Sequence, residues 1–231
     1  AYRQGFGDLI GNGVRALSER IGKGSNDFAI HVKGLPLGGY DPRGAKGEGL
    51  GFAIGSRGGC RHAMGVVARA EISANTRFEV KGKGELVKRL ARTRILSDSA
   101  GLCSFIVGRA IPLETLAKLL STVTGITFTG EALETIGDRI NTVERAFNVR
   151  EGITRKDDTL PERILKEPLP EGMAKGQVLR PEELELMKDE YYRVMGWDVR
   201  TGVPTRECLE NLELVDVATQ LSNLKKLPKA S

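Results

Sequence analysis

The six residues from Asp98 to Cys103 read Asp-Ser-Ala-Gly-Leu-Cys and set a carboxylate and a thiol on either side of a glycine. A carboxylate has two acceptor oxygens that can pair with adjacent N–H donors, as on a pterin ring. A thiolate is the preferred ligand of iron–sulfur clusters. One short turn could therefore hold two redox centres. A lone Cys is also a common apolar filler, and Ala-Gly a common helix end, so the neighbouring motifs must decide.

Those motifs lie upstream of Asp98. Residues 7–14 read GDLIGNGV, and residues 28–60 read FAIHVKGLPLGGYDPRGAKGEGLGFAIGSRGGC. Followed by DSAGLC, this order resembles the C-terminal part of the aldehyde ferredoxin oxidoreductase family, the tungstopterin enzymes of anaerobic metabolism. The resemblance is strong from Gly7 to Val107 and weaker in the helical tail. HVKG, YDPRGAKG, SRGGC and DxxGLC in series form a specific signature.

The resemblance implies two cofactors and a role for several side chains. In this family a tungsten ion is held by two pterin dithiolenes (tungsten bis-pterin), with a 4Fe-4S cluster beside one pterin. By similarity, Asp98 would bind a pterin ring and Leu102 would contact it through its backbone. Cys103 would be the fourth thiolate of the cluster. Arg57, in the SRGGC turn, matches the family's cofactor-contacting Arg.

The implied reaction is the oxidation of a small aldehyde to a carboxylic acid with water, with electrons passing singly through the cluster to ferredoxin. The family's RGxCH motif places a His directly after the Cys, whereas this chain reads Cys60-Arg61-His62. Either His62 still points inward as the catalytic proton-handling residue, or Arg61 fills its place. An incidental surface His is an equal alternative.

Several parts of the family's machinery are missing from these residues, namely the CxxxCxxC cysteines, the first DxxGLD motif and the N-terminal domain that cradles both pterins. One thiolate cannot hold a cluster that needs four ligands. The chain opens at Ala1 rather than Met. We therefore expect a fragment or a split subunit that is inert without an N-terminal portion or partner chain. Residues 1–36 would end the preceding helical domain, and 37–231 would form the C-terminal helical domain.

Hydrophobic periodicity predicts an all-α fold of irregular, multi-helical type with at most short extended segments. Asp41 and Pro42 are good starting residues for a glycine-rich helix from Gly44 to Ser56. Each helical Gly costs roughly 0.5–1 kcal/mol, so close approach of another backbone or of a cofactor is expected there. An irregular excursion is expected at 150–180. The remaining predicted elements are helices at 8–22, 84–97, 112–123, 130–149 and 181–197, two short helices within 205–222, and an extended segment at 27–33.

Composition narrows the class of protein. The net charge is +5 and the pI about 9.2, with much of the basic excess between Arg57 and Arg94. Aromatic interleaving, zinc-finger spacing and RNP-like strings are absent, so we expect no nucleic-acid partner. A solvated helix face or a docking surface for ferredoxin explains the charge. Three widely spaced cysteines and no apolar stretch of ~20 residues indicate a cytoplasmic protein without a membrane span.

Two other functions remain open from the sequence. The altered His position and the missing cysteines would suit a non-catalytic helical interaction module derived from the family. A family member that reduces carboxylates or aromatic acyl thioesters would carry the same motifs. Substrate identity, tungsten versus molybdenum and oligomeric state are left open.

Overall fold

Helices form most of the fold, and the predicted all-α class is confirmed. The structure, a computed structural model, describes residues 3–107 and 111–228. Apart from two isolated bridges, the β-structure of these residues is one antiparallel hairpin of β1 (His31–Val32) and β2 (Leu35–Pro36). The α-helices are α1 (Phe6–Ile10), α2 (Gly13–Ile21), α3 (Lys46–Ile54), α4 (Val67–Ser73), α5 (Lys83–Ser99), α6 (Leu113–Thr124), α7 (Gly130–Arg150), α8 (Glu162–Lys166), α9 (Pro181–Met195), α10 (Arg206–Asn211) and α11 (Val215–Asn223). The 3-10 helices are η1 (Ser25–Phe28), η2 (Pro42–Gly44) and η3 (Arg155–Asp157).

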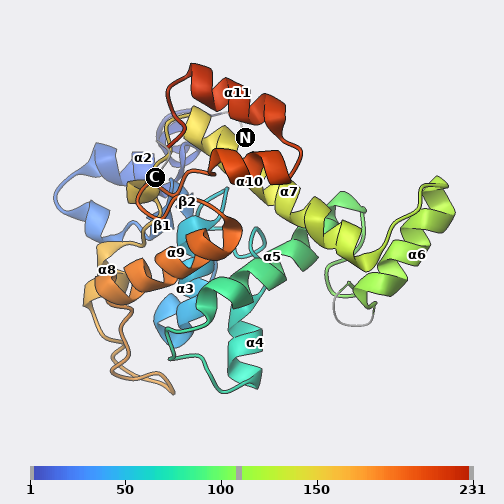
Figure 1. Cartoon of the computed structure of the whole chain (residues 1–231). Coiled ribbons are helices and arrows are strands. Elements are labelled where there is room, and N and C mark those ends of the chain that lie inside the picture. The colour runs from blue at the N-terminus through green and yellow to red at the C-terminus, as the bar shows by residue number, and fades with distance from the viewer. Residues whose placement is uncertain (1–2, 108–110, 229–231) are drawn as a thin grey trace.

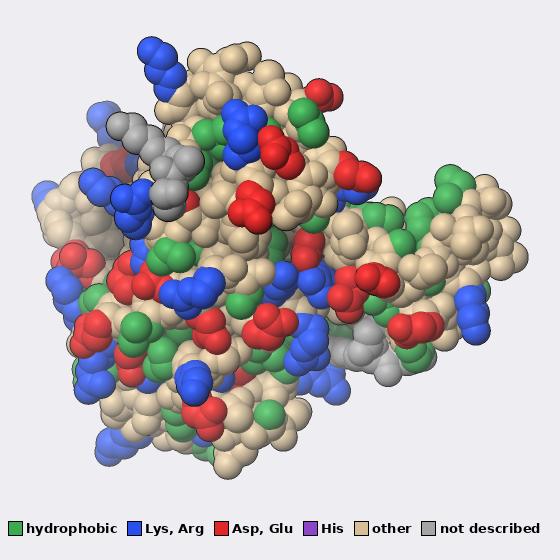
Figure 2. Space-filling view, viewed as in Figure 1, with side chains coloured by type: hydrophobic (Ala, Val, Ile, Leu, Met, Phe, Trp, Pro, Cys, Tyr) green, Lys and Arg blue, Asp and Glu red, His purple; other side chains and the backbone are tan. Residues whose placement is uncertain are grey.

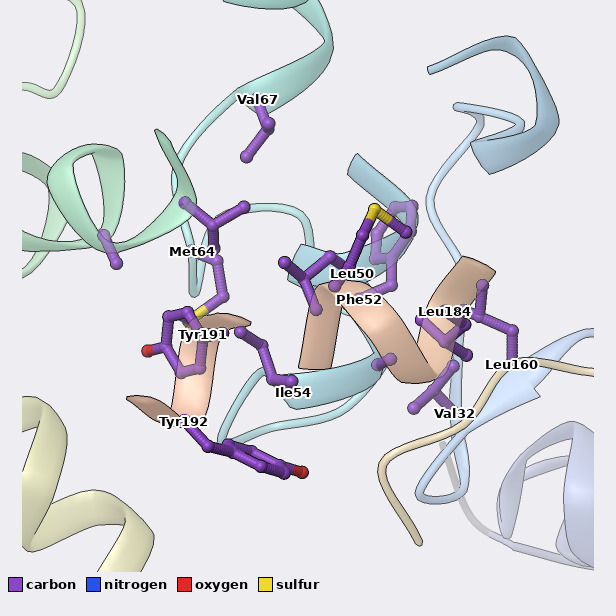
Figure 3. Packing of buried hydrophobic residues seen from close by; sticks show 14 of the residues in the cluster. Val32, Leu50, Phe52, Ile54, Met64, Val67, Leu160, Leu184, Tyr191 and Tyr192 are labelled. Atoms are coloured by element: carbon purple, nitrogen blue, oxygen red, sulfur yellow. The ribbon is translucent and has the colours of Figure 1, made fainter. Parts of the chain in front are cut away.

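The body of the molecule is assembled around α5, which packs against α9, α7 and α3. Figure 1 shows α6 projecting from the body at the far end of α7. The main hydrophobic core joins α3, α5 and α9, and Figure 3 shows Leu50 and Phe52 of α3 in the same cluster as Tyr191 and Tyr192 of α9. All four side chains are almost fully buried. Because α5 is fixed along its length by this packing, its last turn, which carries Asp98, has a defined position.

The glycines of α3 allow close packing. A Cβ added at Gly49 would lie 2.5 Å from Leu179, and one at Gly47 would lie 2.8 Å from Glu71 Oε1. Every residue of α3 is buried. The expected close approach is therefore present, but the side chains of Leu179 and Glu71 make it, rather than another backbone. The Asp41 cap begins η2, and α3 starts two residues after it.

Helix α4 was not predicted from the sequence. It is short, and its N-terminus has no cap from its own preceding residue. Instead, the carboxylate of Glu48 on α3 accepts a hydrogen bond from Ala68 N at 2.7 Å. Glu71 on α4 in turn accepts hydrogen bonds from Gly47 N and Glu48 N of α3, at 2.8 and 3.2 Å. The two helices therefore cap each other across a sequence separation that local patterns do not reveal.

A buried ionic network ties the hairpin to the C-terminal half. Lys33 of the HVKG motif pairs with Asp158 at 2.8 Å, and Arg145 of α7 pairs with Asp158 at 2.7 Å. The Tyr192 hydroxyl donates a third hydrogen bond to Asp158. Burial lowers the pKa of Lys33 from its usual value, against the opposing effect of Asp158. Lys33 also donates to the carbonyls of Ala53 and Gly55, so it holds the end of α3 in place.

The remaining predicted elements begin or end at other residues in the structure than expected. The helix expected at 8–22 is divided into α1 and α2, because Gly13 has φ of +89°, which a continuous α-helix does not accommodate. The extended segment expected at 27–33 is reduced to β1, after η1. The 150–180 segment, predicted to be an irregular excursion over the surface, contains η3 and α8. Its residues Asp158 and Leu179 are buried in the body of the protein. None of the described helices is long and apolar enough to cross a membrane.

Candidate functional site

The DxxGLC turn is a glycine-terminated helix end. Leu102 N donates to Ser97 O at 2.9 Å, and Gly101 N donates to Asp98 O at 3.2 Å, with Gly101 at φ +66°. These are the paired hydrogen bonds of a Schellman motif, in which the left-handed residue is usually Gly. The Ser97 hydroxyl adds a bond to Leu102 O at 2.9 Å. The motif thus fixes Asp98 in the last helical turn and directs the chain at Cys103 away from the helix.

The turn presents its functional atoms to the outside. Asp98, Leu102 and Cys103 are all exposed, and the relative solvent exposure of Leu102 is 39%. Both backbone polar groups of Leu102 are already bonded to Ser97, so a cofactor contact through this backbone would use the second lone pair of its carbonyl. Phe105 and Ile106, just beyond, are exposed large apolar side chains. The carboxylate of Asp98 and the thiol of Cys103 are therefore accessible to a ligand, and the roles predicted for them stay predictions.

Arg94 orients the Asp98 carboxylate. Its Nη2 lies 2.9 Å from Asp98 Oδ1 and its Nε donates to Oδ2 at 3.0 Å, one helical turn away. A carboxylate has about four lone-pair positions, so this fork occupies two and leaves two for other donors. Asp98 can therefore accept a pair of N–H groups from a ring while Arg94 keeps it in place.

The SRGGC turn is fixed by the hairpin. Gly59 N donates to Val32 O, and a Cβ at Gly59 would lie 2.4 Å from Leu35 O. Gly58 has φ of +79°. Only glycines allow this backbone-to-backbone approach, which leaves Arg57 exposed at the tip of the turn. No hydrogen bond or ion pair joins its guanidinium to another described side chain. The N–H donors of the Arg57 guanidinium are therefore available to a ligand.

His62 lies among the other predicted residues. Its pKa is lowered from the usual value, first by partial desolvation and then by the charges of Arg94, Arg61 and Arg57, while Asp98 opposes them. The predicted Arg57 and Asp98 are thus both within electrostatic reach of His62. A lowered pKa keeps the imidazole neutral near pH 7, as a proton acceptor requires.

Arg61 and His62 face different surroundings. The Arg61 guanidinium stacks over the Tyr40 ring, with 4.2 Å from Cζ to the ring centre, and Arg61 is half-buried. His62 is exposed. Both line one pocket of about 280 Å³, bounded by α4, α5 and the segment after Cys103. His62 is thus the more accessible of the two candidates for the proton-handling role.

The metal-binding capacity of the described residues is partial. None of their His, Cys, Asp and Glu side chains form a group of three that could hold a metal ion. Cys103 can contribute one thiolate and Asp98 one ring-binding carboxylate, so the chain fits a share of a pterin and cluster site. Cys208 is unsuited, because burial raises the pKa of its thiol to about 11 and the sulfur bonds to Met195 O at 3.2 Å.

The chain has known relatives in sequence. Residues 1–214 match the family model for aldehyde ferredoxin oxidoreductase, domains 2 and 3, and the chain belongs to this family. It is 37% identical over 222 residues to the tungsten-containing aldehyde ferredoxin oxidoreductase of Pyrococcus furiosus, and 36% identical over 221 residues to that of Thermococcus kodakarensis. Each alignment covers 94% of this chain but 35% of the relative, so the chain spans about a third of their length.

A solved structure shares the fold. The active site complex BamBC of benzoyl coenzyme A reductase, in complex with 1,5-dienoyl-CoA, superposes with a TM-score of 0.76 over 99% of this chain and 39% of that chain. The sequence identity is 20%, so the likeness establishes architecture alone. The same fold therefore accompanies different reactions, and the chemistry must be argued from the site.

Sequence reasoning missed two residues of this region, Arg69 and Arg89. Both are exposed arginines that line the pocket next to His62. Their convergence depends on α4, which was not predicted, and the basic run was assigned to a solvated helix face or a ferredoxin docking surface. On the face shown in Figure 2, acidic and basic side chains are interspersed.

Proposed function

We propose that this chain supplies the C-terminal share of a tungstopterin, iron–sulfur oxidoreductase that oxidises aldehydes to carboxylic acids with ferredoxin as the electron acceptor. The observation that carries the proposal is the Schellman turn after α5, which exposes Asp98 and Cys103, with Asp98 and Arg57 within electrostatic reach of His62. The membership of the family and the tungsten-containing relatives support it. Residues 1–36 would complete a preceding helical domain, and 37–231 would form the C-terminal one.

Each side chain has a distinct task in this proposal. Asp98, held by Arg94, accepts hydrogen bonds from the N–H edge of one pterin ring. Arg57 offers its planar donor fork to an anionic or carbonyl group of the cofactor. Cys103 provides one thiolate ligand of a 4Fe-4S cluster. When bound, the tungsten centre supplies the oxygen-transfer and two-electron chemistry, and the protein orients the reactants.

His62 handles protons. Oxidation of an aldehyde with water yields a carboxylic acid, two protons and two electrons, so a base near the reacting carbon assists the reaction. The neutral imidazole of His62 can accept a proton because partial desolvation, together with the surrounding arginines, lowers its pKa. Exposed on the pocket wall, it can also release that proton to solvent.

The remaining ligands must come from outside these residues. Three more thiolates and the second pterin site would be supplied by an N-terminal portion or by a partner chain that carries CxxxCxxC. The exposed apolar residues Leu102, Phe105 and Ile106 adjoin Cys103 and would be covered by that part. Alone, the 231 residues would be inactive.

Anaerobic purification of the complete protein, or of the complex with its co-purifying partner, tests the proposal. We expect stoichiometric tungsten and about four irons per active site by elemental analysis. Asp98→Asn should lower the tungsten and pterin content, and Cys103→Ser should lower the iron content and alter the cluster's paramagnetic resonance signal. Cys208→Ser is the matched control, because its half-buried thiol is no ligand in this proposal, and it should keep both metals.

Two results would overturn the proposal. Metal contents unchanged in both variants, or negligible in the wild-type complex, would favour a non-catalytic helical module. A metal-loaded complex that reduces aromatic acyl thioesters or carboxylates but oxidises no aldehyde would retain the cofactors and change the reaction. Assays with an aldehyde series and with benzoyl-CoA distinguish these outcomes.

A further inference from the structure

The pocket beside His62 has a pronounced electrostatic asymmetry. Its walls contain four arginines and one histidine, and none of the described residues that line it is acidic. The set comprises Arg61, His62, Arg69, Arg89 and Arg94. Ser73, Thr93 and Ser104 add hydroxyl groups. Side chains of this kind supply several donors that converge on a small volume.

Arg69 and Arg89 lack an acidic partner among the described residues, whereas Arg61 lies within electrostatic reach of the Glu48 carboxyl. Arg94 is paired with Asp98, whereas no ion pair within the described residues involves Arg61, Arg69 or Arg89. Elsewhere the same chain pairs its arginines well, for example Arg92 with Asp138 at 2.6 Å. The Nε of Arg61 is buried and has no hydrogen-bond partner. An unsatisfied buried donor of this kind costs free energy until a ligand accepts from it.

The pocket is elongated along α5, since several of its lining residues follow one another on that helix. Residues 89, 90, 93 and 94 lie on one face of the helix and line the pocket, and Asp98 follows one turn after Arg94. At 1.5 Å per residue, Arg89 lies about 13 Å along the helix axis from Asp98. A small molecule in the pocket could therefore have one end near His62 and its other end near Arg89 and Arg69.

The pocket also limits the size of its ligand. About 280 Å³ is near the lower end of small-molecule sites, which run from roughly 300 to 1,000 Å³. The apolar side chains of Val66, Leu90 and Phe105 contact its interior and suit a short carbon skeleton. A cluster of cations in a partly enclosed site is unfavourable by itself and is relieved by an anion. The complementary ligand is a short molecule with a terminal anionic group.

We propose that this pocket binds the anionic end of the substrate, so that the enzyme acts on small aldehydes that carry a second, negatively charged group, a carboxylate or a phosphate. The inference rests on the proposed aldehyde oxidation and specifies its substrate class. Arg69 and Arg89 hold the anion, and the carbonyl end lies by His62. The apolar walls contact the carbons between them.

Matched substrates test this specificity with the complete metal-loaded protein. The kcat/KM for 4-oxobutanoate should exceed that for butanal, and the kcat/KM for glyceraldehyde 3-phosphate should exceed that for glyceraldehyde. The variants Arg69→Gln and Arg89→Gln should each lower the anion-to-neutral ratio roughly tenfold or more, since each removes a charge-assisted hydrogen bond. Higher ionic strength should lower the same ratio. Arg20→Gln, which removes an exposed Arg of α2 outside the pocket, is the control and should keep the ratio.

A binding measurement separates this inference from the proposed oxidation. Calorimetry with succinate and with inorganic phosphate should show binding to the complete protein that the double variant Arg69→Gln/Arg89→Gln loses. Such binding without turnover of any aldehyde would refute the proposed oxidation and support the anion site.

Two outcomes would overturn the anion site itself. One is turnover of aldehydes with equal kcat/KM for the charged and neutral members of each pair. The other is a double variant that loses tungsten and pterin but still binds succinate and phosphate as the wild type does, because the arginines would then hold the cofactor rather than the anion of the substrate.

Discussion

Glu48 offers a sharp test of the packing between α3 and α4. Its side chain is 2% exposed, lies near Glu71 and accepts a hydrogen bond from Ala68 N. Burial, reinforced by the charge of Glu71, raises the pKa of Glu48 from 4.5 to about 7. Because the folded state holds this proton up to about pH 7 and the unfolded chain releases it near 4.5, the folded state binds more protons between these values. The free energy of unfolding therefore falls as pH rises through that window.

The magnitude follows from the size of the shift. At 1.36 kcal/mol per pKa unit, ionised Glu48 costs the folded state about 3 kcal/mol at pH 8. Glu48→Gln removes this cost while its amide oxygen can still accept from Ala68 N. The variant should be more stable than the wild type by about 2–3 kcal/mol at pH 8 and nearly equal to it at pH 4.5. With about 2–4 °C per kcal/mol for a chain of this size, Tm at pH 8 should rise by roughly 5–10 °C.

The measurement is thermal and urea unfolding at several pH values, monitored by circular dichroism. Glu71→Gln is the matched control of opposite sign. Glu71 pairs with Lys83 at 2.7 Å, and the Lys83 side chain is 2% exposed. The loss of this charge leaves a buried cation unpaired and should cost about 3–5 kcal/mol. A Glu48→Gln protein that is less stable at pH 8, or whose gain is independent of pH, would refute the reasoning.

Three further predictions concern other parts of the chain. Asp158→Asn should lower the free energy of unfolding by about 3–5 kcal/mol in urea, because it leaves Lys33 and Arg145 buried without their carboxylate. Simultaneous replacement of Lys33 by Met removes one of these two cations and should restore part of the loss, and purely additive losses would contradict this. Gly59→Ala should cost about 1–3 kcal/mol in a thermal melt, since its Cβ would lie 2.4 Å from Leu35 O, and an unchanged Tm would disprove that contact. In the metal-loaded protein, higher ionic strength should move the acid limb of the kcat/KM profile to higher pH, because it screens the cations that lower the pKa of His62; a fixed limb would exclude His62 as the base.

The local features of the site could be predicted from the sequence. Apolar periodicity indicated a helix at 84–97, and α5 occupies 83–99. The Gly after Asp-Ser-Ala satisfies the left-handed position that ends this helix, so the DxxGLC turn follows from residues within one stretch of six. The exposure of Asp98 and Cys103 follows from the same turn. The roles assigned to them remain predictions.

Other features could not be inferred because they join distant residues. Helix α4 depends on a cap from Glu48, some 20 residues earlier, and the pocket arginines converge only because α4 and α5 face each other. The irregular 150–180 segment contains Asp158, whose partners Lys33 and Arg145 are on other elements. No pattern within a short window records such contacts.

The amino-acid sequence by itself determined the helical class, the family resemblance and the geometry of the turn that carries Asp98 and Cys103, since backbone preferences and hydrogen bonds within a few residues control them. Tertiary structure alone decided which charges surround His62, which carboxyl groups lose their water and where a pocket forms. Desolvation and Coulomb interactions depend on distances in space rather than on spacing in the chain, and these distances exist only after the helices have packed.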